Sequence, residues 1–374
     1  MDLQNSKKPI VLVGGGIHSS CSLDLFREFI QLIKIPVVNS LMAVDALSYY
    51  DPLRVGFIGS YGNRWANITL SNSDFVLVLG SRLDVRQTGS QVKEFKGNKT
   101  IYHVDCEKGE INNRISGCVV VNSTLQSFLT SIIKYIGKKE FQTRKDWIDE
   151  INYLKNLFPD YKENSKISGI NPNNFMHKLS KFSKKASVIV SDVGQHQMWA
   201  AQSLELRKNQ RFLTSGGMGS MGFGLPASIG AAFTKSPSPI VLIAGDGGFQ
   251  SNIQELQTVA HHNLPIKIVI LNNRCHGMVR QFQEKLFDKR YQSTLWGYSA
   301  PNFEKIALSY GIKAKTIKTE SEIEKALEWL WKQPKDPQLL QVMIDTFTNA
   351  YPKMVFGLPN YKMEPFKNLV HHCT

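Results

Sequence analysis

The chain has 374 residues, of which 42% are hydrophobic, and a formal net charge of +14. This length favours two domains, since single domains commonly hold roughly 100–200 residues. No apolar run reaches the roughly 18–20 residues of a membrane-spanning helix, and the first residues lack the apolar core of a signal peptide. We therefore expect a cytoplasmic protein with no membrane partner.

The cysteines and the basic residues are both scattered along the chain. None of the five cysteines forms a C-x-x-C pair, which favours free thiols over a disulfide framework or a zinc site. Lysines and arginines occur as single residues or short pairs such as Lys7-Lys8. A solvated basic surface that attracts anionic substrates fits this pattern better than a nucleic-acid interface, which would show basic tracts with interleaved aromatic residues.

Strand and helix patterns alternate in the first half of the chain. An amphipathic helix is expected at residues 22–34, and apolar strands are expected at residues 9–13, 35–38, 75–80 and 100–104. Such alternation predicts a parallel, doubly wound α/β sheet. Charged helical sequence from about residue 123 to 168 is interpreted as a connector, so the domain boundary is placed near residue 165.

The first predicted strand runs into a glycine turn, Gly14-Gly15-Gly16. The turn could bind a phosphate or simply join a strand to a helix. It is not a G-x-G-x-x-G motif, because Ser19 stands where the last glycine would fall. A glycine turn after a strand is weak evidence by itself, so the plain turn is favoured.

The second half repeats the α/β pattern to about residue 347. A helix is expected at residues 252–262, between two buried strands at 240–244 and 266–271. In such a βαβ unit the strands are parallel, so Asp246 and Asn273 should emerge at the same edge of the sheet. A carboxylate and an amide oxygen at that edge can share a hard cation such as Mg²⁺.

Four segments together resemble the acetolactate synthases, which are thiamine diphosphate-dependent enzymes. In chain order they are residues 192–202, residues 215–226, Gly245-Asp246-Gly247-Gly248, and residues 271–279 with the pair Asn272-Asn273. A GDG turn followed downstream by an NN pair is the signature of thiamine diphosphate binding. The resemblance covers nearly the whole chain. It implies a central Rossmann-like domain at residues 1–165 and a thiamine diphosphate-binding domain at residues 166–374, both with doubly wound parallel sheets.

The resemblance also implies a set of cofactor-binding residues. Asp246, Asn273 and the main-chain carbonyl of Cys275 would hold Mg²⁺, which ties the cofactor diphosphate to the protein. The other implied cofactor-binding residues are Val193, Gly194, Gln195, His196, Gly219, Met221, Gly245, Gly247, Gly248, Gly277 and Met278. Gln195 and His196 would reach the diphosphate, and Met221 would support the folded cofactor. His276 is interpreted either as a catalytic residue or as a solvent-facing loop histidine.

Two segments of the first domain, residues 59–63 and 79–89, resemble those that hold FAD in the acetolactate synthases. The candidate residues are Arg82, Asp84 and Arg86, because guanidinium groups suit the flavin diphosphate. Several relatives keep this domain without a flavin, so arginines that only pack the domain are the alternative.

Two features depart from the family pattern. Phe282 stands where the acetolactate synthases carry a tryptophan that shapes the substrate channel, which leaves the acceptor open. The family's N-terminal pyrimidine-binding domain, which carries the glutamate that activates the cofactor, has no counterpart in this sequence. We therefore expect the catalytic glutamate to lie outside this chain, which would be a fragment, one chain of a split enzyme or a degenerate copy.

The function implied by the resemblance is that of a Mg²⁺- and thiamine diphosphate-dependent carboligase. It would decarboxylate a pyruvate-like 2-oxo acid and join the remainder to a carbonyl acceptor, as in branched-chain amino acid biosynthesis. It would form a homo-oligomer or pair with a pyrimidine-domain chain. The alternatives are a related 2-oxo acid decarboxylase, a ligase of a surface-sugar pathway, and a non-catalytic cofactor-binding subunit.

Overall fold

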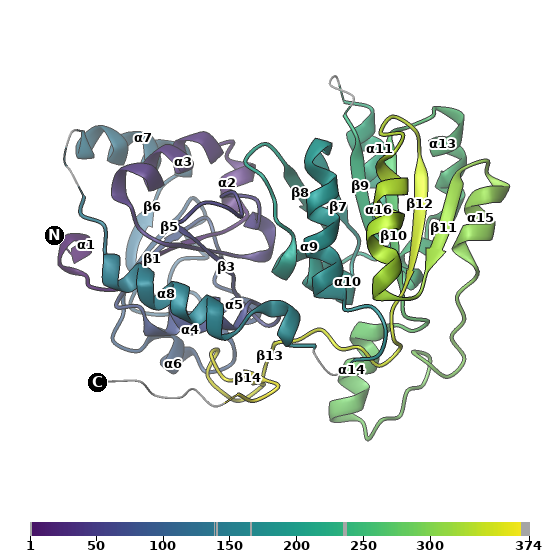
Figure 1. Ribbon diagram of the computed structural model, residues 1–374. Helices are drawn as coiled ribbons and strands as arrows, with labels where there is room; N and C mark the ends of the chain where they lie inside the picture. Colours follow the sequence, from purple (N-terminus) through teal and green to yellow (C-terminus); the bar gives the residue numbers. More distant parts are fainter. Residues whose placement is uncertain (1, 138, 140, 165–166, 235–237, 368–374) are drawn as a thin grey trace. The chain divides into compact units, whose positions relative to one another are not determined.

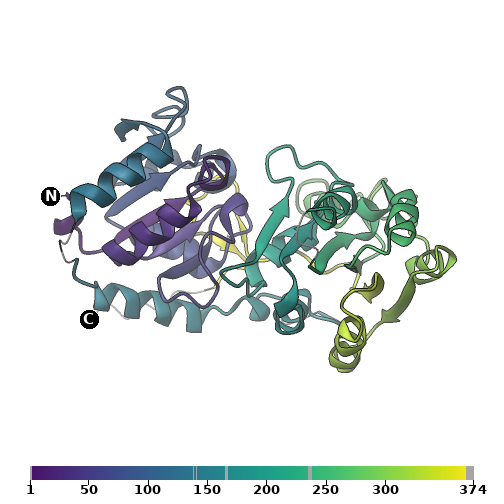
Figure 2. The same cartoon turned by 90° about the horizontal axis from the view of Figure 1, so that it is seen from above.

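The computed structural model describes residues 2–137, 139, 141–164, 167–234 and 238–367. The chain divides into two compact units, Met1–Glu163 with Tyr351–Thr374, and Asn164–Ala350. Each unit contains a six-stranded sheet with helices on both faces (Figures 1 and 2). Both sheets are fully parallel, as predicted for doubly wound α/β domains.

The first sheet has the strand order β3-β2-β1-β4-β5-β6, which is the order of a Rossmann sheet. Its strands are β1 (Pro9–Val13), β2 (Val37–Asn39), β3 (Arg54–Phe57), β4 (Phe75–Leu79), β5 (Thr100–Asp105) and β6 (Val119–Asn122). Its longer helices are α3 (Leu23–Ile33), α4 (Arg64–Asn72), α7 (Leu125–Ile136) and α8 (Lys145–Leu157). The shorter ones are α1 (Asp2–Asn5), α2 (Gly16–Ser19), η1 (Leu41–Ala43), α5 (Val85–Thr88), α6 (Val92–Lys96) and η2 (Asp160–Lys162).

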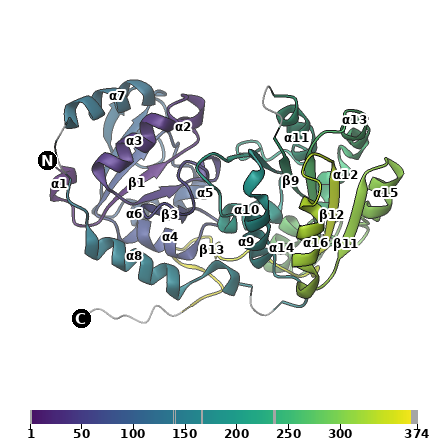
Figure 3. The ribbon, with the colours of Figure 1, turned by 45° about the horizontal axis from the view of Figure 1, so that its top comes forward.

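The side chains of alternate residues of β1 pack into two separate hydrophobic cores, one on each face of this sheet. Ile10 and Leu12 lie in the core covered by α4 and α8, whereas Val11 and Val13 lie in the core covered by α3 and α7. Figure 3 shows these helix pairs on opposite sides of the sheet. Burial on both faces explains why the strand sequence is apolar throughout, since successive side chains point to opposite faces.

The glycine turn after β1 leads from this strand into α2. A Cβ atom at Gly14 would collide with the backbone of Gly80 and Ser81, and one at Gly16 would lie 2.8 Å from the Gly80 Cα. The glycines therefore allow two neighbouring strand ends to approach each other closely.

The second sheet has the strand order β11-β12-β10-β9-β7-β8. Its strands are β7 (Val188–Ser191), β8 (Arg211–Thr214), β9 (Ile240–Gly245), β10 (Ile266–Asn272), β11 (Lys313–Ile317) and β12 (Gln338–Met343). Its helices are α9 (Pro172–Phe182), α10 (Gln195–Ser203), α11 (Gly224–Ala232), α12 (Asp246–Gln250), α13 (Leu256–His261), α14 (Gly277–Leu286), α15 (Phe303–Ser309) and α16 (Ile323–Trp331), with short 3-10 turns η3 (Ser183–Lys185), η4 (Ile253–Glu255) and η5 (Glu320–Glu322). The single helix expected at residues 252–262 is instead divided between η4 and α13.

The end of the chain corrects the predicted domain assignment, which placed residues 351–374 in the second domain. Its described part, residues 351–367, belongs to the first unit, where β13 (Lys353–Met354) pairs antiparallel with β14 (Met363–Glu364). The Arg64 guanidinium donates to the carbonyl of Met363 at 3.0 Å and to that of Pro365 at 2.8 Å. These hydrogen bonds join residues some 300 positions apart, and no local sequence pattern predicts such a pairing.

Within the described ranges, no helix combines the length and the apolar character needed to cross a membrane.

Arg64→Met is expected to destabilise the first unit by about 3 kcal/mol, because breaking a buried ion pair leaves the other charge buried. Arg64 is buried and pairs with the Glu163 carboxylate at 2.8 Å, so the substitution would leave Glu163 with Lys367 alone. Urea denaturation measures the change. The matched control is Arg290→Met, which removes an exposed pair and should cost less than about 0.5 kcal/mol. Equal losses in the two variants would contradict the prediction.

Candidate functional site

The candidate site lies at the carboxyl ends of β7, β9 and β10. Asp192 follows β7, Asp246 follows β9 and Asn273 follows β10. β7 and β9 are neighbours in the sheet. The strand that follows β7 in the chain, β8, lies toward one edge of the sheet, whereas the strand that follows β9, β10, lies toward the opposite edge. In doubly wound sheets, ligands bind in the crevice at such a switch point. A cavity of about 400 Å³ lies here.

The cavity brings together every predicted cofactor-binding residue except Gly219. The predicted residues that line it are Val193, Gly194, Gln195, His196, Met221, Gly245, Asp246, Gly247, Gly248, Asn273, Cys275, Gly277 and Met278. Gly219 lies nearby, since a Cβ atom there would be 4.0 Å from Val193 Cγ1. His276 and Val279 also line the cavity, together with Trp199, which was not predicted as a site residue.

Asp192 holds the glycine-rich loop of residues 215–226 against the end of β7. Its buried carboxylate accepts backbone N–H hydrogen bonds from Val193 at 2.6 Å, Gly222 at 3.1 Å and Gly224 at 2.7 Å. A Cβ atom at Gly248 would overlap the same carboxylate. The sequence contains a signal for this role, because Asp192 stands at the end of a predicted strand and precedes a glycine-rich loop. No role was predicted for Asp192.

Asp246 is a buried carboxylate, and among the described residues no basic side chain pairs with it. Burial raises its pKa to about 6, although hydrogen bonds from Tyr298 and from backbone N–H groups oppose the shift. The Tyr298 hydroxyl donates to Asp246 Oδ2 at 3.0 Å. Burying a carboxylate without a positive partner is costly, so the position suits a cation that would compensate the charge.

The cavity wall also holds buried polar atoms that lack partners among the described residues, namely His196 Nε2 and Trp199 Nε1. Burial lowers the pKa of His196 to about 4, against the opposing effect of Asp192, so the imidazole is neutral near pH 7. A Cβ atom at Gly245 would lie 2.8 Å from His196 Nδ1. A glycine at the end of β9 therefore lets this ring reach the wall, where both orphaned atoms are available to a polar ligand.

Gln195 is placed differently from the expectation that it reaches a diphosphate. Its Oε1 accepts from Asn273 Nδ2 at 3.1 Å, and its Nε2 donates to Gln281 Oε1 at 3.1 Å. Both ends of the amide are thus engaged by protein groups. Direct contact between the Gln195 side chain and a diphosphate stays a prediction.

His276 is half-buried at the cavity wall. Its ring packs against that of Tyr298 with centroids 4.4 Å apart, and burial lowers its pKa. A Cβ atom at Gly247 would lie 2.7 Å from His276 Cε1, so the turn after β9 leaves room for the ring. Of the two interpretations of His276, the structure favours a place in the site over a solvent-facing loop.

The donor set at this edge suits a hard cation held mainly by oxygen. Among the described residues, no group of three or more His, Cys, Asp or Glu side chains could hold a metal ion. The predicted ligands are one carboxylate, an amide oxygen and the Cys275 carbonyl, which also accepts from the Gly277 N–H at 2.9 Å. Mg²⁺ commonly takes this kind of sparse protein set and completes six oxygens with ligand phosphates and water.

The flavin candidates lie in the first unit. A cavity of about 590 Å³ is lined by Arg82, Asp84, Arg86 and Arg114 among others. Asp84 also caps α5, accepting from the backbone N–H of Arg86 at 2.9 Å. The Ser60 N–H donates to the carbonyl of Arg86 at 2.6 Å, so the two segments singled out for FAD lie against each other.

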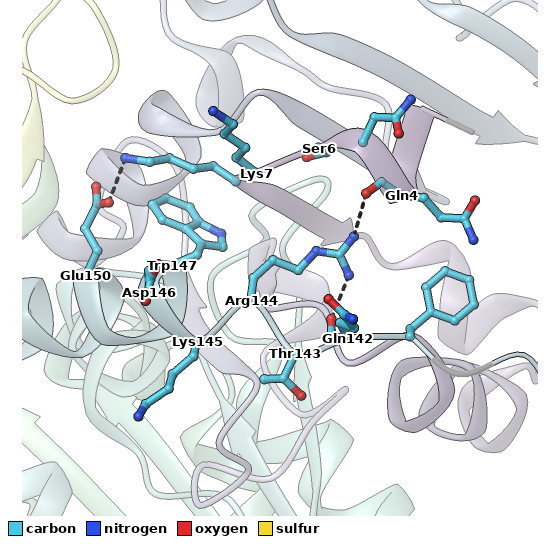
Figure 4. A pocket seen from close by; sticks show the side chains of 13 residues that line it. Gln4, Ser6, Lys7, Gln142, Thr143, Arg144, Lys145, Asp146, Trp147 and Glu150 are labelled. Carbon is cyan, nitrogen blue, oxygen red and sulfur yellow. Dashed lines mark hydrogen bonds and ion pairs between the residues drawn. The ribbon is translucent and has the colours of Figure 1, made fainter.

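A larger hollow of about 850 Å³ lies elsewhere in the first unit, between the start of the chain and the start of α8 (Figure 4). Its arginine, Arg144, donates to the carbonyls of Leu3 and Gln142, and Lys8 pairs with Glu150 at 2.6 Å. No predicted site residue lines this hollow. Two of its cationic side chains, Arg144 and Lys8, are thus engaged by protein partners.

Comparison with known proteins identifies both units. Residues 192–342 match the thiamine pyrophosphate enzyme C-terminal TPP binding domain, and residues 2–132 match the thiamine pyrophosphate enzyme central domain. The chain belongs to the thiamine pyrophosphate enzymes. Thiamine pyrophosphate is another name for thiamine diphosphate, so the resemblance found in the motifs is confirmed.

The similar curated proteins are acetolactate synthase large subunits. The one from Cyanidium caldarium is 36% identical over 366 residues, covering 96% of this chain and 62% of the relative. That from Lactococcus lactis subsp. lactis is 33% identical over 362 residues, covering 97% of this chain and 62% of the relative. A probable large subunit from Methanococcus aeolicus is 36% identical over 357 residues, covering 92% and 59%. This chain thus spans about three fifths of the length of these relatives.

Asp246→Asn is expected to raise the free energy of unfolding of the metal-free protein by up to about 3 kcal/mol at pH 8. The folded pKa of about 6 exceeds the ordinary value of 3.8, so the folded state binds this proton more tightly than the unfolded state. Wild-type stability should therefore fall as pH rises between these values, whereas an asparagine carries no charge to bury.

Urea unfolding of both proteins from about pH 4 to pH 8 measures this effect, and the difference should shrink toward the acidic end. Asp192→Asn is the matched control. It removes an equally buried carboxylate that is fully engaged by backbone N–H groups, and it should destabilise the protein. An Asp246→Asn variant no more stable than wild type at pH 8 would contradict the expectation.

Proposed function

We propose that this chain forms the cofactor-holding part of a Mg²⁺- and thiamine diphosphate-dependent carboligase of the acetolactate synthase type. The observation that carries the proposal is the buried Asp246 carboxylate, which has no positively charged partner among the described residues. It lines the cavity that holds the predicted cofactor-binding residues. The names of the similar proteins support a pyruvate-like 2-oxo acid as the substrate class.

The residues at the cavity fit the cofactor and its metal. Asp246, Asn273 and the Cys275 carbonyl would hold Mg²⁺. The backbone N–H groups of Gly247 and Gly248 would meet the diphosphate, whose oxygens accept hydrogen bonds, and His196 lies in the same cavity wall.

When bound, thiamine diphosphate supplies the electron sink that decarboxylation of a 2-oxo acid requires. The chain contributes position and environment. Met221, Met278 and Val279 give the cavity an apolar part of its lining. His276 is neutral near pH 7 because burial lowers its pKa, so a ring nitrogen can accept a proton from a substrate group.

We further propose that cofactor activation depends on a pyrimidine-binding segment. That segment would be carried by a longer form of this protein or by another chain, and the active assembly would be a homo-oligomer or a pair of such chains. The alternative functions differ in product, since a decarboxylase releases an aldehyde from pyruvate whereas a carboligase yields a product enlarged by the acceptor. Product analysis with and without an added 2-oxo acid acceptor separates them.

Asp246→Ala is expected to abolish Mg²⁺-dependent binding of thiamine diphosphate, because it removes the only carboxylate of the proposed metal site. Isothermal titration calorimetry with and without Mg²⁺ measures this. Asp288→Ala, at a position whose side chain is 94% exposed, is the control and should bind as wild type does. Unchanged affinity in Asp246→Ala would refute the metal assignment.

We also propose that FAD binds at the cavity lined by Arg82, Asp84 and Arg86. Purified protein incubated with FAD should retain the yellow colour and visible absorbance of a flavin after gel filtration. Replacing Arg82 and Arg86 together with alanine should weaken FAD binding about tenfold or more, since each guanidinium can form a charge-assisted hydrogen bond with phosphate. The control is Arg290→Ala, an exposed arginine of the other unit. Failure of the wild-type chain to retain FAD would refute this assignment.

A further inference from the structure

Three side-chain amides form a continuous chain from the proposed metal site to the backbone of Ala350. Asn273 Nδ2 donates to Gln195 Oε1 at 3.1 Å, and Gln195 Nε2 donates to Gln281 Oε1 at 3.1 Å. Gln281 Nε2 donates to the Ala350 carbonyl at 3.0 Å, and the Ala350 N–H donates back to Gln281 Oε1 at 3.0 Å. All four residues are buried. We call this series the amide relay.

The orientation of each amide in the relay is set by the backbone at its far end. A backbone N–H can only donate and a backbone carbonyl can only accept, so Ala350 fixes which end of Gln281 is oxygen. The oxygen of Gln281 then requires the NH₂ group of Gln195, and the oxygen of Gln195 requires the NH₂ group of Asn273. Reversing any one amide would bring two oxygens or two NH₂ groups together in a buried environment, where unmade hydrogen bonds are costly.

The consequence appears at Asn273. Its NH₂ group is held by Gln195, so its Oδ1 is the end left for the site. Oδ1 accepts from the Cys275 N–H at 3.3 Å, which uses one of the two lone pairs of an amide oxygen. The remaining lone pair is available to a hard cation beside Asp246.

The start of α14 is shaped to accommodate the relay. A Cβ atom at Gly277 would collide with Gln195 Oε1 and would lie 2.6 Å from Asn273 Nδ2. Glycine at this position is therefore needed for the contact between these two amides, independently of any contact with a ligand. Gln281 follows one helical turn later on α14, on the same face, because residues four apart on a helix are neighbours.

We propose that Gln281 is a positioning residue for the metal site, which it serves without touching the metal. Through Gln195 it orients Asn273 so that an oxygen and not an NH₂ group is presented to Mg²⁺. This inference rests on the proposed function, because it assigns a task to Gln281 only if Asn273 binds Mg²⁺. Partners that orient metal ligands typically contribute 10–100-fold to metal affinity.

The first test is Gln281→Met, which nearly preserves the side-chain volume and removes both amide ends. The Mg²⁺ concentration needed for thiamine diphosphate binding, measured by calorimetry on the full chain, should rise about 10–100-fold. Gln281→Glu should stay close to wild type, because a buried, protonated carboxyl keeps an acceptor for Gln195 and a donor for Ala350. If Gln281→Met does not fold, Gln281→Leu takes its place.

The matched control is Gln210→Met. Gln210 is also buried and is also anchored by the backbone, since its Oε1 accepts from the Arg207 N–H and its Nε2 donates to the Ser183 and Ala186 carbonyls. It has no side-chain link to the site. Its loss should lower stability and leave the Mg²⁺ requirement unchanged, so it measures the purely structural cost of losing a buried glutamine.

Repeating Gln281→Met in a protein that already carries Asn273→Asp distinguishes a loss of Asn273 orientation from a general loosening of the site. The two oxygens of a carboxylate are equivalent, so after Asn273→Asp there is no end to orient. In that background Gln281→Met should leave the Mg²⁺ requirement unchanged or lower it, because Gln195 becomes free to turn its NH₂ group toward the carboxylate. Such non-additivity is the mark of a direct coupling between the residues.

The outcomes decide between the relay and the function on which it rests. Equal weakening by Gln281→Met in both backgrounds, or no weakening beyond that of Gln210→Met, would overturn the relay and leave the proposed function intact. A wild-type chain that binds thiamine diphosphate without any Mg²⁺ dependence would overturn the proposed metal site and the relay with it.

Discussion

The site exists because β7, β9 and β10 run parallel as neighbours in one sheet. Parallel strands end at a common edge, so three residues far apart in the chain, Asp192, Asp246 and Asn273, must emerge together there. The loops that follow these strands then share one cavity. Everything else described at the site, including the glycine loop, the orphaned polar atoms and the amide relay, is built onto this edge.

The polar groups at this edge fall into two sets that act in opposite directions on stability. Asp192 and the relay amides have their hydrogen bonds satisfied within the protein, and they hold the loops in place. Asp246 and His196 are buried with pKa values shifted by desolvation and with capacity left for a ligand. Buried groups such as Asp246 and His196, which lower stability, persist where function selects them. The hydrogen-bonded groups around them, Asp192 and the relay amides, offset that loss of stability.

The two sheets differ from the sequence-based expectation mainly at their edges. Apolar runs predicted the central strands β1, β4, β9 and β10, whose residues are buried on both faces of the sheet. No individual strand was predicted at the four edge strands β3, β6, β8 and β11, nor at β12, an inner strand whose apolar run is interrupted by Gln341. Most of these edges alternate buried and exposed positions or are largely exposed, so their sequences lack a continuous apolar run.

The sequence by itself determined the family, the parallel α/β architecture and most of the residues that line the cavity, because these depend on short motifs and on apolar runs that are local in the chain. Only the tertiary structure decided which residues support them. Asp192 acts through glycines 30 and 32 residues away, Gln281 acts through the backbone of Ala350, and the segment that begins at Tyr351 returns to Arg64 in the first unit. Each of these roles depends on hydrogen bonds between distant segments. A polar side chain carries no mark in the sequence of which partner folding will bring to it.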